Sequence, residues 1–428
     1  MNIAIAGFGV EGRANLAYWQ AKGDTVTVLD ESESVQIPEG VASRTGAAVF
    51  SQLEEFDMVV RTASLRPDKL ASAHKVWSAT NEFFAQCPET VVGVTGTKGK
   101  GTTSTLIANI LQQAGKTVHL VGNIGVPALD VLPRIQPDDV VVFELSSFQL
   151  WDLEKSPHTA VVLMIEPDHQ DVHRDMKEYV SAKANIRRHQ VVGDTCFYHP
   201  TNMLSKQVAE TSEISQPRRF GVPEEGACYV KQNTFFVQND PICSVDTLQV
   251  VGQHNVENAC AAISAAWEYT HSKDAVSEAL QAFTGLPHRL KFVREVGGVA
   301  YYDDSIATTP GSAIAALDSF RQPKVIILGG SDKGASYDEL VQKCRARAAR
   351  VVTMGQTGSA IAELCRQQGV PVVETGEQGM SATVAAAANW AQPGDVVILS
   401  PASASFGMFA NYTDRGEQFV AAVEALGE

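Results

Sequence analysis

Short apolar runs rich in β-branched residues alternate with amphipathic segments along most of this chain. Near its start, apolar runs over 2–6 and 25–29 flank a segment of helical periodicity that ends close to Gly23. Buried strands that alternate with helices are typical of a parallel sheet with helices packed on its faces. The pattern therefore predicts a strand–helix domain, to which we assign residues 1–88.

A second series of strands and helices follows. Apolar runs over 89–95, 116–121, 140–143 and 159–165 predict four strands, and 99–114 has the pattern of a helix. Between 221 and 251 the pattern changes to short alternating strands with turn residues, which favours a small antiparallel insertion. An apolar helix is expected over 252–270. We assign 89–284 to a central domain built on a parallel sheet.

The remaining residues, 285–428, repeat the alternation of strands and helices. Strands are expected over 299–302, 324–328, 350–354, 370–374 and 396–399, with helical segments between them. This doubly wound pattern predicts a Rossmann-like C-terminal domain. Three α/β domains also agree with a length of 428 residues, since one domain takes roughly 150 residues.

The charge balance narrows the possible partners. Lys and Arg number 34 against 49 Asp and Glu, and the net charge of −15 argues against nucleic acid or an anionic membrane as a partner. No apolar run approaches the ~20 residues that span a bilayer, and the N-terminus lacks the pattern of a signal peptide. Seven cysteines without C-x-x-C spacing indicate reduced, buried thiols. We expect a cytoplasmic protein, and a monomer.

A glycine motif directly follows the first predicted strand. Gly7, Gly9 and Gly12 form G-x-G-x-x-G, and Asp30 ends the next strand. Such glycines let the backbone approach a diphosphate at a helix N-terminus, so Gly9, Val10 and Asp30 are candidate contacts for a dinucleotide or nucleotide sugar on a Rossmann-like domain. The same glycines also suit a tight strand–helix turn without a ligand. Alone, the motif would suggest a dehydrogenase.

The strongest motif covers residues 92–103, where a strand leads into a glycine-rich loop and a lysine opens a helix. Backbone N–H groups of such a loop surround phosphates, and Lys100 would reach the terminal ones. Two positions depart from the general ATPase phosphate loop: Val94 replaces its first glycine, and Gly101 replaces its Ser or Thr. Thr102 or Thr103 must then supply a hydroxyl to Mg²⁺. The expected ATP contacts are Gly96, Thr97, Lys98, Gly99, Lys100, Gly101 and Thr102.

Two further strand ends lie on the same carboxyl edge of the predicted central sheet. Glu144 follows the strand over 140–143, where a carboxylate can hold Mg²⁺ opposite a phosphate loop, although it also fits an ordinary strand-end acid. His169, with three acids around it, follows the strand over 159–165. Lys183, by pattern alone, is a helix lysine on a solvated face.

Together these residues resemble the Mur ligase family, ATP-dependent amide-bond ligases of peptidoglycan precursor synthesis. The resemblance covers nearly the whole chain, and its segments are, in order, 95–103, 122–125, 144–150, 168–169, 183, 252–258, 285–289, 304–305, 329–334 and 400–405. The segments ELSSFQL and SPASASF are most similar to members that add glutamate to UDP-N-acetylmuramoyl-L-alanine. The glycine loop of the first domain fits the UDP part of that substrate.

The resemblance implies roles for the matching positions. ATP would be bound by the phosphate loop, with further contacts to adenine, ribose and phosphates from Asn255, Asn258, Arg289 and Asp304. Two Mg²⁺ ions would be surrounded by Thr102, Glu144, His169 and Lys183. Carbamylation by CO₂ would turn the Lys183 ammonium into an anionic oxygen ligand. Catalysis would depend on Lys100, Glu144, His169 and Lys183.

The implied reaction joins two anionic substrates. The alanine carboxylate of UDP-N-acetylmuramoyl-L-alanine attacks the γ-phosphate of ATP, and the amine of glutamate then attacks the acyl phosphate. Mg²⁺ and Lys100 would neutralise charge in the transition state. Asn123 would bind the UDP substrate. The binding site for glutamate would be lined by Thr308, Lys333, Ser405 and Tyr412.

One position departs from the glutamate-adding members. Ile306 stands where they carry a lysine that helps to bind the carboxylates of glutamate. A lost charge-assisted contact of this kind is worth roughly 1.5–3 kcal/mol. Either another cation compensates, for which Lys333 and Arg415 are the candidates, or the substrate is bound differently. We expect D-glutamate as the substrate, with L-glutamate or a less charged amino acid as the alternative.

Three other functions compete with this reading. A folylpolyglutamate synthase matches Gly101 in the phosphate loop but not the segments ELSSFQL and SPASASF. A NAD-dependent dehydrogenase leaves the loop around Lys100 unexplained. A catalytically silent relative that binds nucleotide and regulates a partner is disfavoured by the intact set of Lys100, Glu144, His169 and Lys183.

Overall fold

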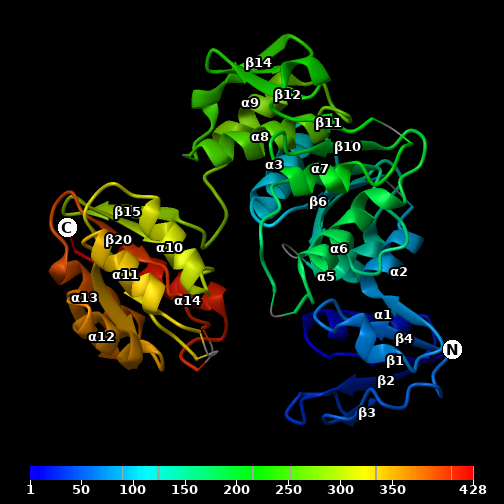
Figure 1. Ribbon diagram of the computed structural model, residues 1–428, viewed down its shortest axis with the longest axis horizontal. Helices are drawn as coiled ribbons and strands as arrows, with labels where there is room; N and C mark the ends of the chain where they lie inside the picture. Colours follow the sequence, from blue (N-terminus) through cyan, green and yellow to red (C-terminus); the bar gives the residue numbers. More distant parts are fainter. Residues whose placement is uncertain are drawn as a thin grey trace. The chain divides into compact units, whose positions relative to one another are not determined.

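The computed structural model describes residues 1–88, 90–122, 126–170, 172–214, 216–250, 252–332, 335–405 and 407–427. The chain forms two compact units, Met1–Phe283 and Thr284–Glu428, and Figure 1 shows the helices and strands of each. The boundary predicted at residue 88 falls inside the first unit, so the division of that unit into two domains stays a prediction.

A five-stranded parallel sheet with the order β3-β2-β1-β4-β5 occupies the N-terminal part of the first unit. Helix α1 buries Leu16 and Trp19 against one face, and Leu53 and Phe56 cover the other. The predicted strands over 2–6 and 25–29 are confirmed. The elements are β1 (Asn2–Ala6), α1 (Val10–Ala21), β2 (Thr25–Asp30), β3 (Ala42–Thr45), β4 (Met58–Arg61), β5 (Val76–Ser78) and α2 (Ala79–Gln86).

The central sheet has six parallel strands in the order β11-β10-β9-β6-β8-β7. Its strands alternate with helices, as predicted. Successive residues such as Val141 and Val142 point to opposite faces and are both buried, so both faces of the sheet are covered. The elements are β6 (Thr90–Thr95), α3 (Lys100–Gln113), β7 (Val118–Gly122), α4 (Ala128–Val131), β8 (Val140–Glu144), α5 (Ser147–Leu150), β9 (Thr159–Val162), α6 (Met176–Arg188), β10 (Thr195–Tyr198), α7 (Met203–Ala209) and β11 (Arg218–Arg219).

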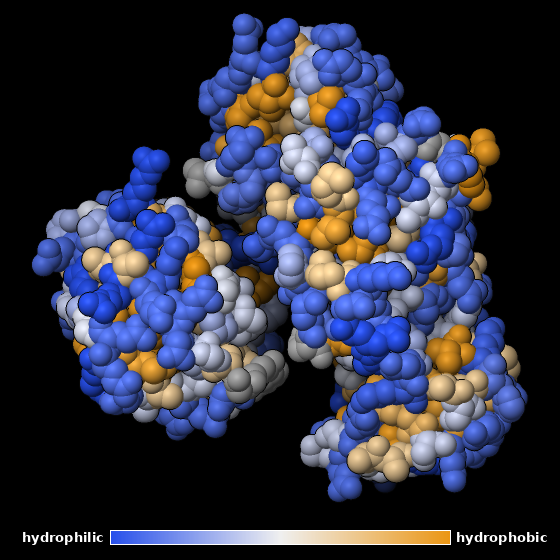
Figure 2. Space-filling model, in the orientation of Figure 1, coloured by the Kyte–Doolittle hydropathy of each residue, from blue (hydrophilic) through white to orange (hydrophobic). Residues whose placement is uncertain are grey.

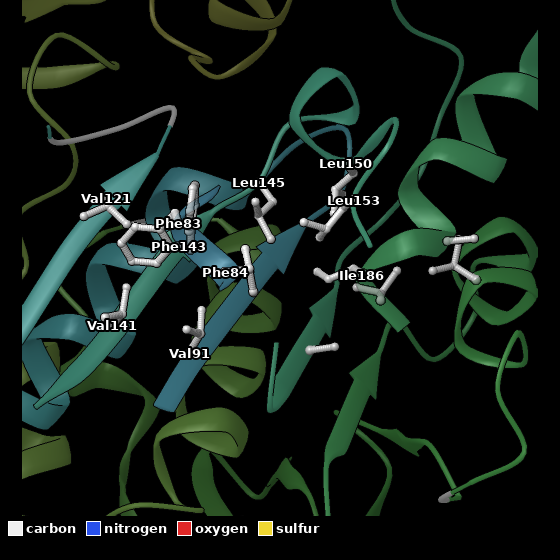
Figure 3. Close-up of a cluster of buried hydrophobic side chains, with 14 of the residues drawn as sticks. Phe83, Phe84, Val91, Val121, Val141, Phe143, Leu145, Leu150, Leu153 and Ile186 are labelled. Atoms are coloured by element: carbon white, nitrogen blue, oxygen red, sulfur yellow. The ribbon is translucent and has the colours of Figure 1, made fainter. Parts of the chain in front are cut away.

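An aromatic cluster ties α2 to the central sheet. Figure 3 shows Phe83 and Phe84 of α2 beside Phe143 of β8. The ring of Phe84 stacks on Phe143 with centroids 5.7 Å apart, and Phe83 meets Phe143 edge-on at 5.3 Å. Aromatic pairs in these arrangements add stability beyond their buried area. Helix α2, which belongs to the predicted first domain, thus packs on the sheet of the second.

A buried arginine makes a second link between these two sheets. Arg61, at the end of β4, has no solvent exposure, and its Nε and Nη2 donate to the Asp152 carboxylate after α5 at 2.9 and 2.7 Å. Nη2 also donates to the Phe148 carbonyl, and Nη1 donates to the carbonyls of Thr62, Ala63 and Leu65. All three nitrogens of the guanidinium are therefore hydrogen-bonded. Through its bonds to Asp152 and Phe148, Arg61 connects the N-terminal sheet to the central sheet across the boundary between them, which we call the seam.

The predicted antiparallel insertion is confirmed between residues 228 and 244. Both of its hairpins turn on two consecutive non-glycine residues with positive φ, Gln232-Asn233 and Gln238-Asn239, as tight hairpin turns require. The predicted helix after the insertion is α8, which packs beside α3 (Figure 1). The elements are β12 (Cys228–Lys231), β13 (Thr234–Val237), β14 (Asp240–Ser244), α8 (Gln253–Ala266) and α9 (Lys273–Ala282).

The second unit contains a mixed sheet with the order β15-β16-β20-β17-β18-β19, in which only β15 is antiparallel. Helices α13 and α14 cover one face, and α10, α11 and α12 cover the other. The elements are β15 (Lys291–Val296), β16 (Val299–Asp303), α10 (Pro310–Asp318), β17 (Lys324–Leu328), α11 (Asp338–Ala346), β18 (Arg350–Met354), α12 (Gly358–Gln367), β19 (Val372–Gly376), α13 (Met380–Trp390), β20 (Val396–Leu399) and α14 (Tyr412–Glu424).

The surface agrees with a composition in which 19% of the residues are charged. The face drawn in Figure 2 is mostly hydrophilic, with separate apolar patches on both units. The seven cysteines, all within the described ranges, form no disulfides, and each is buried except Cys243, which is half-buried. None of the helices in the described ranges is long and apolar enough to cross a bilayer.

Candidate active site

The glycine loop between β6 and α3 has the geometry of a phosphate cradle. Gly96 and Gly99 both have positive φ, +152° and +85°. A Cβ at Gly96 would lie 2.7 Å from Cβ of Leu163, and one at Gly99 would lie 2.3 Å from Oδ1 of Asn258. Both positions therefore require glycine. The Thr97 hydroxyl closes the loop: it accepts from the Glu166 N–H at 2.9 Å and lies 3.1 Å from the Glu166 carbonyl.

Two lysines converge on the carbonyl of Gly96. Lys100 Nζ donates to it at 3.1 Å, and Lys183 Nζ, from α6, donates to it at 3.0 Å. Lys183 is only 1% exposed, so the solvated face suggested by its helix pattern is wrong. Burial, together with the nearby charge of Lys100, holds the pKa of Lys183 well below its usual range. Two lysine side chains directed at one carbonyl of a glycine cradle favour an anionic ligand there.

The candidate metal ligands come from segments that follow strands at the carboxyl edge of the central sheet, where the cradle also lies. Thr102 on the first turn of α3 and Glu144 at the end of β8 are buried, with 7% and 5% exposure. The Thr103 hydroxyl lies 3.5 Å from Oδ1 of Asn258, which leaves Thr102 as the better hydroxyl ligand of the two. His169 has a positive φ of +53°, and its ring lies 4.8 Å from that of Phe148.

The start of α8 lies beside the phosphate loop. Asn258 is buried next to Gly99 and Thr103, and its Nδ2 donates to Oδ1 of Asn255 at 3.4 Å. Lys98 is largely exposed and pairs with Glu166 at 3.1 Å. The structure thus brings the predicted adenine contacts to the phosphate loop.

The N-terminal glycine motif adopts the close turn expected of it. A Cβ at Gly7 would lie 2.3 Å from the Thr62 hydroxyl, and one at Gly12 would lie 2.3 Å from the Gly7 carbonyl. Asp30 accepts the Phe8 N–H at 2.7 Å, so this carboxylate closes the loop. Gly9 and Val10 are exposed at the N-terminus of α1.

A cavity of about 410 Å³ lies within the first unit, between the N-terminal and central sheets. Its lining includes Val10 and Glu11 of α1, Thr80 of α2, and Ser146 and Gln149 around the start of α5. The Glu11 carboxylate accepts the Ala63 N–H at 2.6 Å, and burial raises its pKa. The cavity places polar groups from both sheets around one space. Asn123 and Lys333, two predicted substrate contacts, lie outside the described residues.

The second unit gathers the remaining candidates at the carboxyl edge of its sheet. Asp304, directly after β16, accepts the Ser400 hydroxyl at 2.7 Å and the Leu290 N–H at 3.1 Å. Burial raises the pKa of Asp304 to about 7. Arg289, the residue before Leu290, is exposed.

The predicted glutamate contacts lie on loops at this edge. Ser405 is buried in the segment after β20, and Thr308 is half-buried before α10. Tyr412 is 41% exposed at the start of α14, and its carbonyl accepts the Ser305 hydroxyl at 2.7 Å. The half-buried Ile306 donates its N–H to the His288 carbonyl.

Arg415 does not have the exposure that a compensating cation needs. Its side chain is fully buried and donates to the Ser305 hydroxyl, the Ser305 carbonyl and the Ser403 carbonyl at 2.8–3.0 Å. The expectation that Arg415 replaces the missing lysine at 306 is therefore disfavoured. Its guanidinium instead fixes the segments that carry Ser305 and Ser403.

Comparison with known proteins decides the family. Residues 94–266 match the model of the Mur ligase middle domain, and residues 288–403 match that of the Mur ligase, glutamate ligase domain. The UDP-N-acetylmuramoylalanine–D-glutamate ligase of Acetivibrio thermocellus is 35% identical over 99% of this chain and 96% of its own length. The chain belongs to the Mur ligase family. The ligase of the same name from Symbiobacterium thermophilum is also 35% identical, over 99% of this Mur ligase and 98% of its own length.

Solved structures share the fold of this Mur ligase. The UDP-N-acetylmuramate–alanine ligase of Thermotoga maritima superposes with a TM-score of 0.63 at 17% identity, over 99% of both chains. MurF of Acinetobacter baumannii gives 0.61 at 20% identity, over 95% of this chain and 86% of its own. These matches confirm the predicted fold class. Members of the family are ATP-dependent ligases that form amide bonds, and this chain is such a ligase.

The residues at the phosphate loop fit Mg²⁺, which the family uses with ATP. Within the described residues, no three His, Cys, Asp or Glu side chains form a ready metal cage. Mg²⁺ does not need one, since it commonly takes one or two protein ligands together with waters and substrate phosphates. The Thr102 hydroxyl and the Glu144 carboxylate supply the hard oxygen ligands that this arrangement requires.

Proposed function

We propose that this Mur ligase joins D-glutamate to the alanine carboxylate of UDP-N-acetylmuramoyl-L-alanine, with cleavage of ATP to ADP and phosphate. The observation that carries the chemistry is the convergence of Lys100 and Lys183 on the glycine cradle of β6 and α3. The choice of substrates rests on the names of the relatives that match almost the whole chain.

The reaction begins with transfer of the γ-phosphate to the substrate carboxylate. A carboxylate oxygen attacks phosphorus, the bond to the β-phosphate oxygen breaks, and an acyl phosphate and ADP result. Lys100 lies where it can offset the negative charge of the transferring group, and the loop N–H groups bind the phosphates. In the second step the amine of glutamate attacks the acyl carbon, and phosphate leaves.

Two Mg²⁺ ions are proposed at the carboxyl edge of the central sheet. Thr102, Glu144, His169 and a carbamylated Lys183 would hold them together with the phosphates of ATP. When bound, the ions neutralise phosphate charge. His169 is 45% exposed on its side chain, so it can turn toward such a ligand without unfolding the loop.

Carbamylation of Lys183 is supported by its surroundings. A buried ammonium is costly without a counter-charge, yet the hydrogen bonds of Lys183 within the described part of the chain go to Gly96 O and, at 3.4 Å, Thr95 Oγ1. The Tyr179 ring faces Nζ at 4.6 Å. A neutral amine in this position is the form that attacks CO₂, and the resulting carbamate loses a proton and becomes an anionic metal ligand.

The UDP substrate is proposed to enter between the two sheets of the first unit. Gly9, Val10 and Asp30 would contact its nucleotide part, and the cavity between α1 and α5 would take the sugar and peptide part toward the phosphate loop. Asn123, on the segment after β7, is proposed as a further contact. Its neighbours Gly122 and Pro127 line the cavity.

The incoming amino acid is proposed to bind on the second unit. Thr308, Lys333, Ser405 and Tyr412 would bind D-glutamate on the second unit. Ile306 favours a second candidate, a ligase for L-glutamate or a less charged amino acid, because an apolar side chain stands where the resemblance implies a lysine.

The proposed function is tested by release of phosphate with purified full-length protein. UDP-N-acetylmuramoyl-L-alanine, ATP, Mg²⁺ and each amino acid of a panel are supplied. In a parallel reaction, a folate replaces the UDP substrate and glutamate is the amino acid. We expect phosphate release only with the UDP substrate and D-glutamate. Release with a folate in place of the UDP substrate would instead show a folylpolyglutamate synthase.

A further inference from the structure

A buried carboxylate and a histidine form a pair at the edge of the second unit where the amino acid is proposed to bind. Asp303 is the last residue of β16, and His288 lies in the loop before β15. Nδ1 of His288 and Oδ2 of Asp303 are 2.6 Å apart. Neither residue was among the predicted contacts, although His288 lies in the segment 285–289 that carries the family resemblance.

The pair fixes which nitrogen of His288 is free. The Asp303 side chain is 1% exposed, and its Oδ1 accepts the Ser305 N–H at 2.9 Å. With Oδ2 of Asp303 as the acceptor, Nδ1 of the imidazole carries the hydrogen and donates it to the carboxylate. The other ring nitrogen, Nε2, then has a lone pair and makes no hydrogen bond within the described residues. A histidine held in this way is oriented as a proton acceptor.

The surrounding backbone holds the ring in place. The His288 carbonyl accepts the Ile306 N–H at 3.0 Å. A Cβ at Gly416 on α14 would lie only 2.1 Å from Nδ1 of His288 and 2.9 Å from Oδ2 of Asp303. The glycine therefore lets α14 pack directly onto the pair. His288 is 11% exposed on its side chain, which is too little for a freely rotating surface residue and enough for a ligand to reach it.

The position of the pair matches a need of the proposed reaction. The ring centroid of His288 lies 6.3 Å from that of Tyr412. Ser305 donates its N–H to Asp303 and its hydroxyl to the Tyr412 carbonyl. The pair is therefore part of the candidate amino-acid site. The α-amine of an amino acid is mostly protonated at neutral pH and cannot attack an acyl carbon until it loses a proton.

We propose that His288 is the general base that deprotonates the incoming amino acid and that Asp303 is its positioning residue. This inference rests on the proposed function. Nε2 takes one proton from the α-ammonium and becomes an imidazolium. The amine lone pair forms the C–N bond, the C–O bond to phosphate breaks, and phosphate leaves with that electron pair. The second proton of the former amine passes to the departing phosphate.

The test separates acyl-phosphate formation from attack by the amino acid. Full-length protein is given UDP-N-acetylmuramoyl-L-alanine, ATP and Mg²⁺, with either glutamate or hydroxylamine as nucleophile. Hydroxylamine is largely unprotonated at neutral pH, so it traps the acyl phosphate as a hydroxamate without a base. The variants are His288→Gln, Asp303→Asn and, as a control for a histidine exposed elsewhere, His74→Gln.

We expect His288→Gln to lower the rate of amide formation with glutamate by about 10²–10⁴-fold, as is usual for loss of a general base. Hydroxamate formation should stay within a few-fold of the wild type. Asp303→Asn should shift the ratio of amide to hydroxamate in the same direction, with kcat for glutamate falling and its KM nearly unchanged. His74→Gln should change neither product.

Three results would overturn the inference. Equal losses of amide and hydroxamate in His288→Gln would show that the pair only supports the structure, and unchanged amide formation would show that another group takes the proton. A wild-type protein that forms hydroxamate but no amide with any glutamate would instead refute the proposed amino acid, and the assignment of the base would fall with it.

Discussion

Arg61 offers the sharpest test of how the first unit is held together. We consider the substitution Arg61→Met, which keeps the length of the side chain and removes the guanidinium. The variant loses two bonds to the Asp152 carboxylate and one to the Phe148 carbonyl, all of which cross the seam between the two sheets. It also leaves the carbonyls of Thr62, Ala63 and Leu65 without this donor.

The structure sets the size of the effect. Removal of one partner of a buried ion pair costs roughly 3–5 kcal/mol, and the Arg61 side chain has no exposure. The Asp152 side chain is 24% exposed and regains some water, which favours the lower end of that range. We therefore expect the seam to open more easily by about 3 kcal/mol. At 1.4 kcal/mol per factor of ten, this corresponds to an opening constant raised by roughly 100-fold.

Hydrogen exchange read by mass spectrometry measures this opening directly, which matters because a multidomain chain has no single unfolding free energy. Peptides that cover 61–65 and 146–153 should lose about 100-fold in protection, and the KM for the UDP substrate should rise. The control is Arg44→Met, which removes an ion pair with Glu55 whose partners are about half exposed. That pair should contribute at most about 1 kcal/mol. Equal protection in both variants would refute the assignment of Arg61 as the link across the seam.

The other predictions concern the active site and its pH dependence. Lys100→Ala should lower substrate-dependent phosphate release at least ~100-fold in a folded protein, because it removes the cation nearest the transferring group. Lys183→Ala should be inactive, with part of the activity restored by acetate. Ile306→Lys should lower the KM for glutamate by about 10- to 100-fold, because one new charge-assisted contact is worth roughly 1.5–3 kcal/mol. Burial raises the pKa of Asp304 to about 7 from 3.8, so its stabilising contribution is present at low pH and lost as the pH rises from about 4 to 7. At 1.36 kcal/mol per pH unit, this amounts to about 4 kcal/mol at most, and the melting temperature of Asp304→Asn relative to the wild type should rise by several degrees between pH 5 and 8.

Each of these has an outcome that contradicts it. Near-native turnover in folded Lys100→Ala would remove the phosphate cradle from the mechanism. Full activity of Lys183→Ala without acetate would exclude a metal-binding carbamate. An unchanged KM in Ile306→Lys would show that position 306 does not contact glutamate. Parallel melting curves of wild type and Asp304→Asn across this pH range would show that Asp304 titrates as an ordinary carboxyl.

The strands were predicted best where burial on both faces gives a continuous apolar run. β18 and β20 have the bounds expected from sequence, 350–354 and 396–399. The edge strand β15 was missed because its sequence, KFVREV, mixes charged and apolar residues and it is largely exposed. Edge strands carry a weaker pattern for this physical reason.

The site was predictable from sequence where one local motif makes it, as in the phosphate loop. Lys183 was placed in the site by resemblance alone, since a lysine in an amphipathic helix normally faces solvent. Arg61 and Asp152 are 91 positions apart, and no local pattern connects them. The pair of His288 and Asp303 depends on the loop before β15 folding back against the end of β16 and on Gly416 beneath it. Such tertiary contacts have no signal in hydrophobic periodicity.

The addition of D-glutamate to UDP-N-acetylmuramoyl-L-alanine by this ligase can be measured directly. In the most direct measurement, the protein is given UDP-N-acetylmuramoyl-L-alanine, ATP, Mg²⁺ and equal concentrations of isotopically distinct D- and L-glutamate. The product is identified by mass spectrometry. We expect a product that contains only the D-isomer, together with one ADP and one phosphate for each amide formed. A product that contains L-glutamate, or ATP cleavage without any amide, would contradict the proposed function.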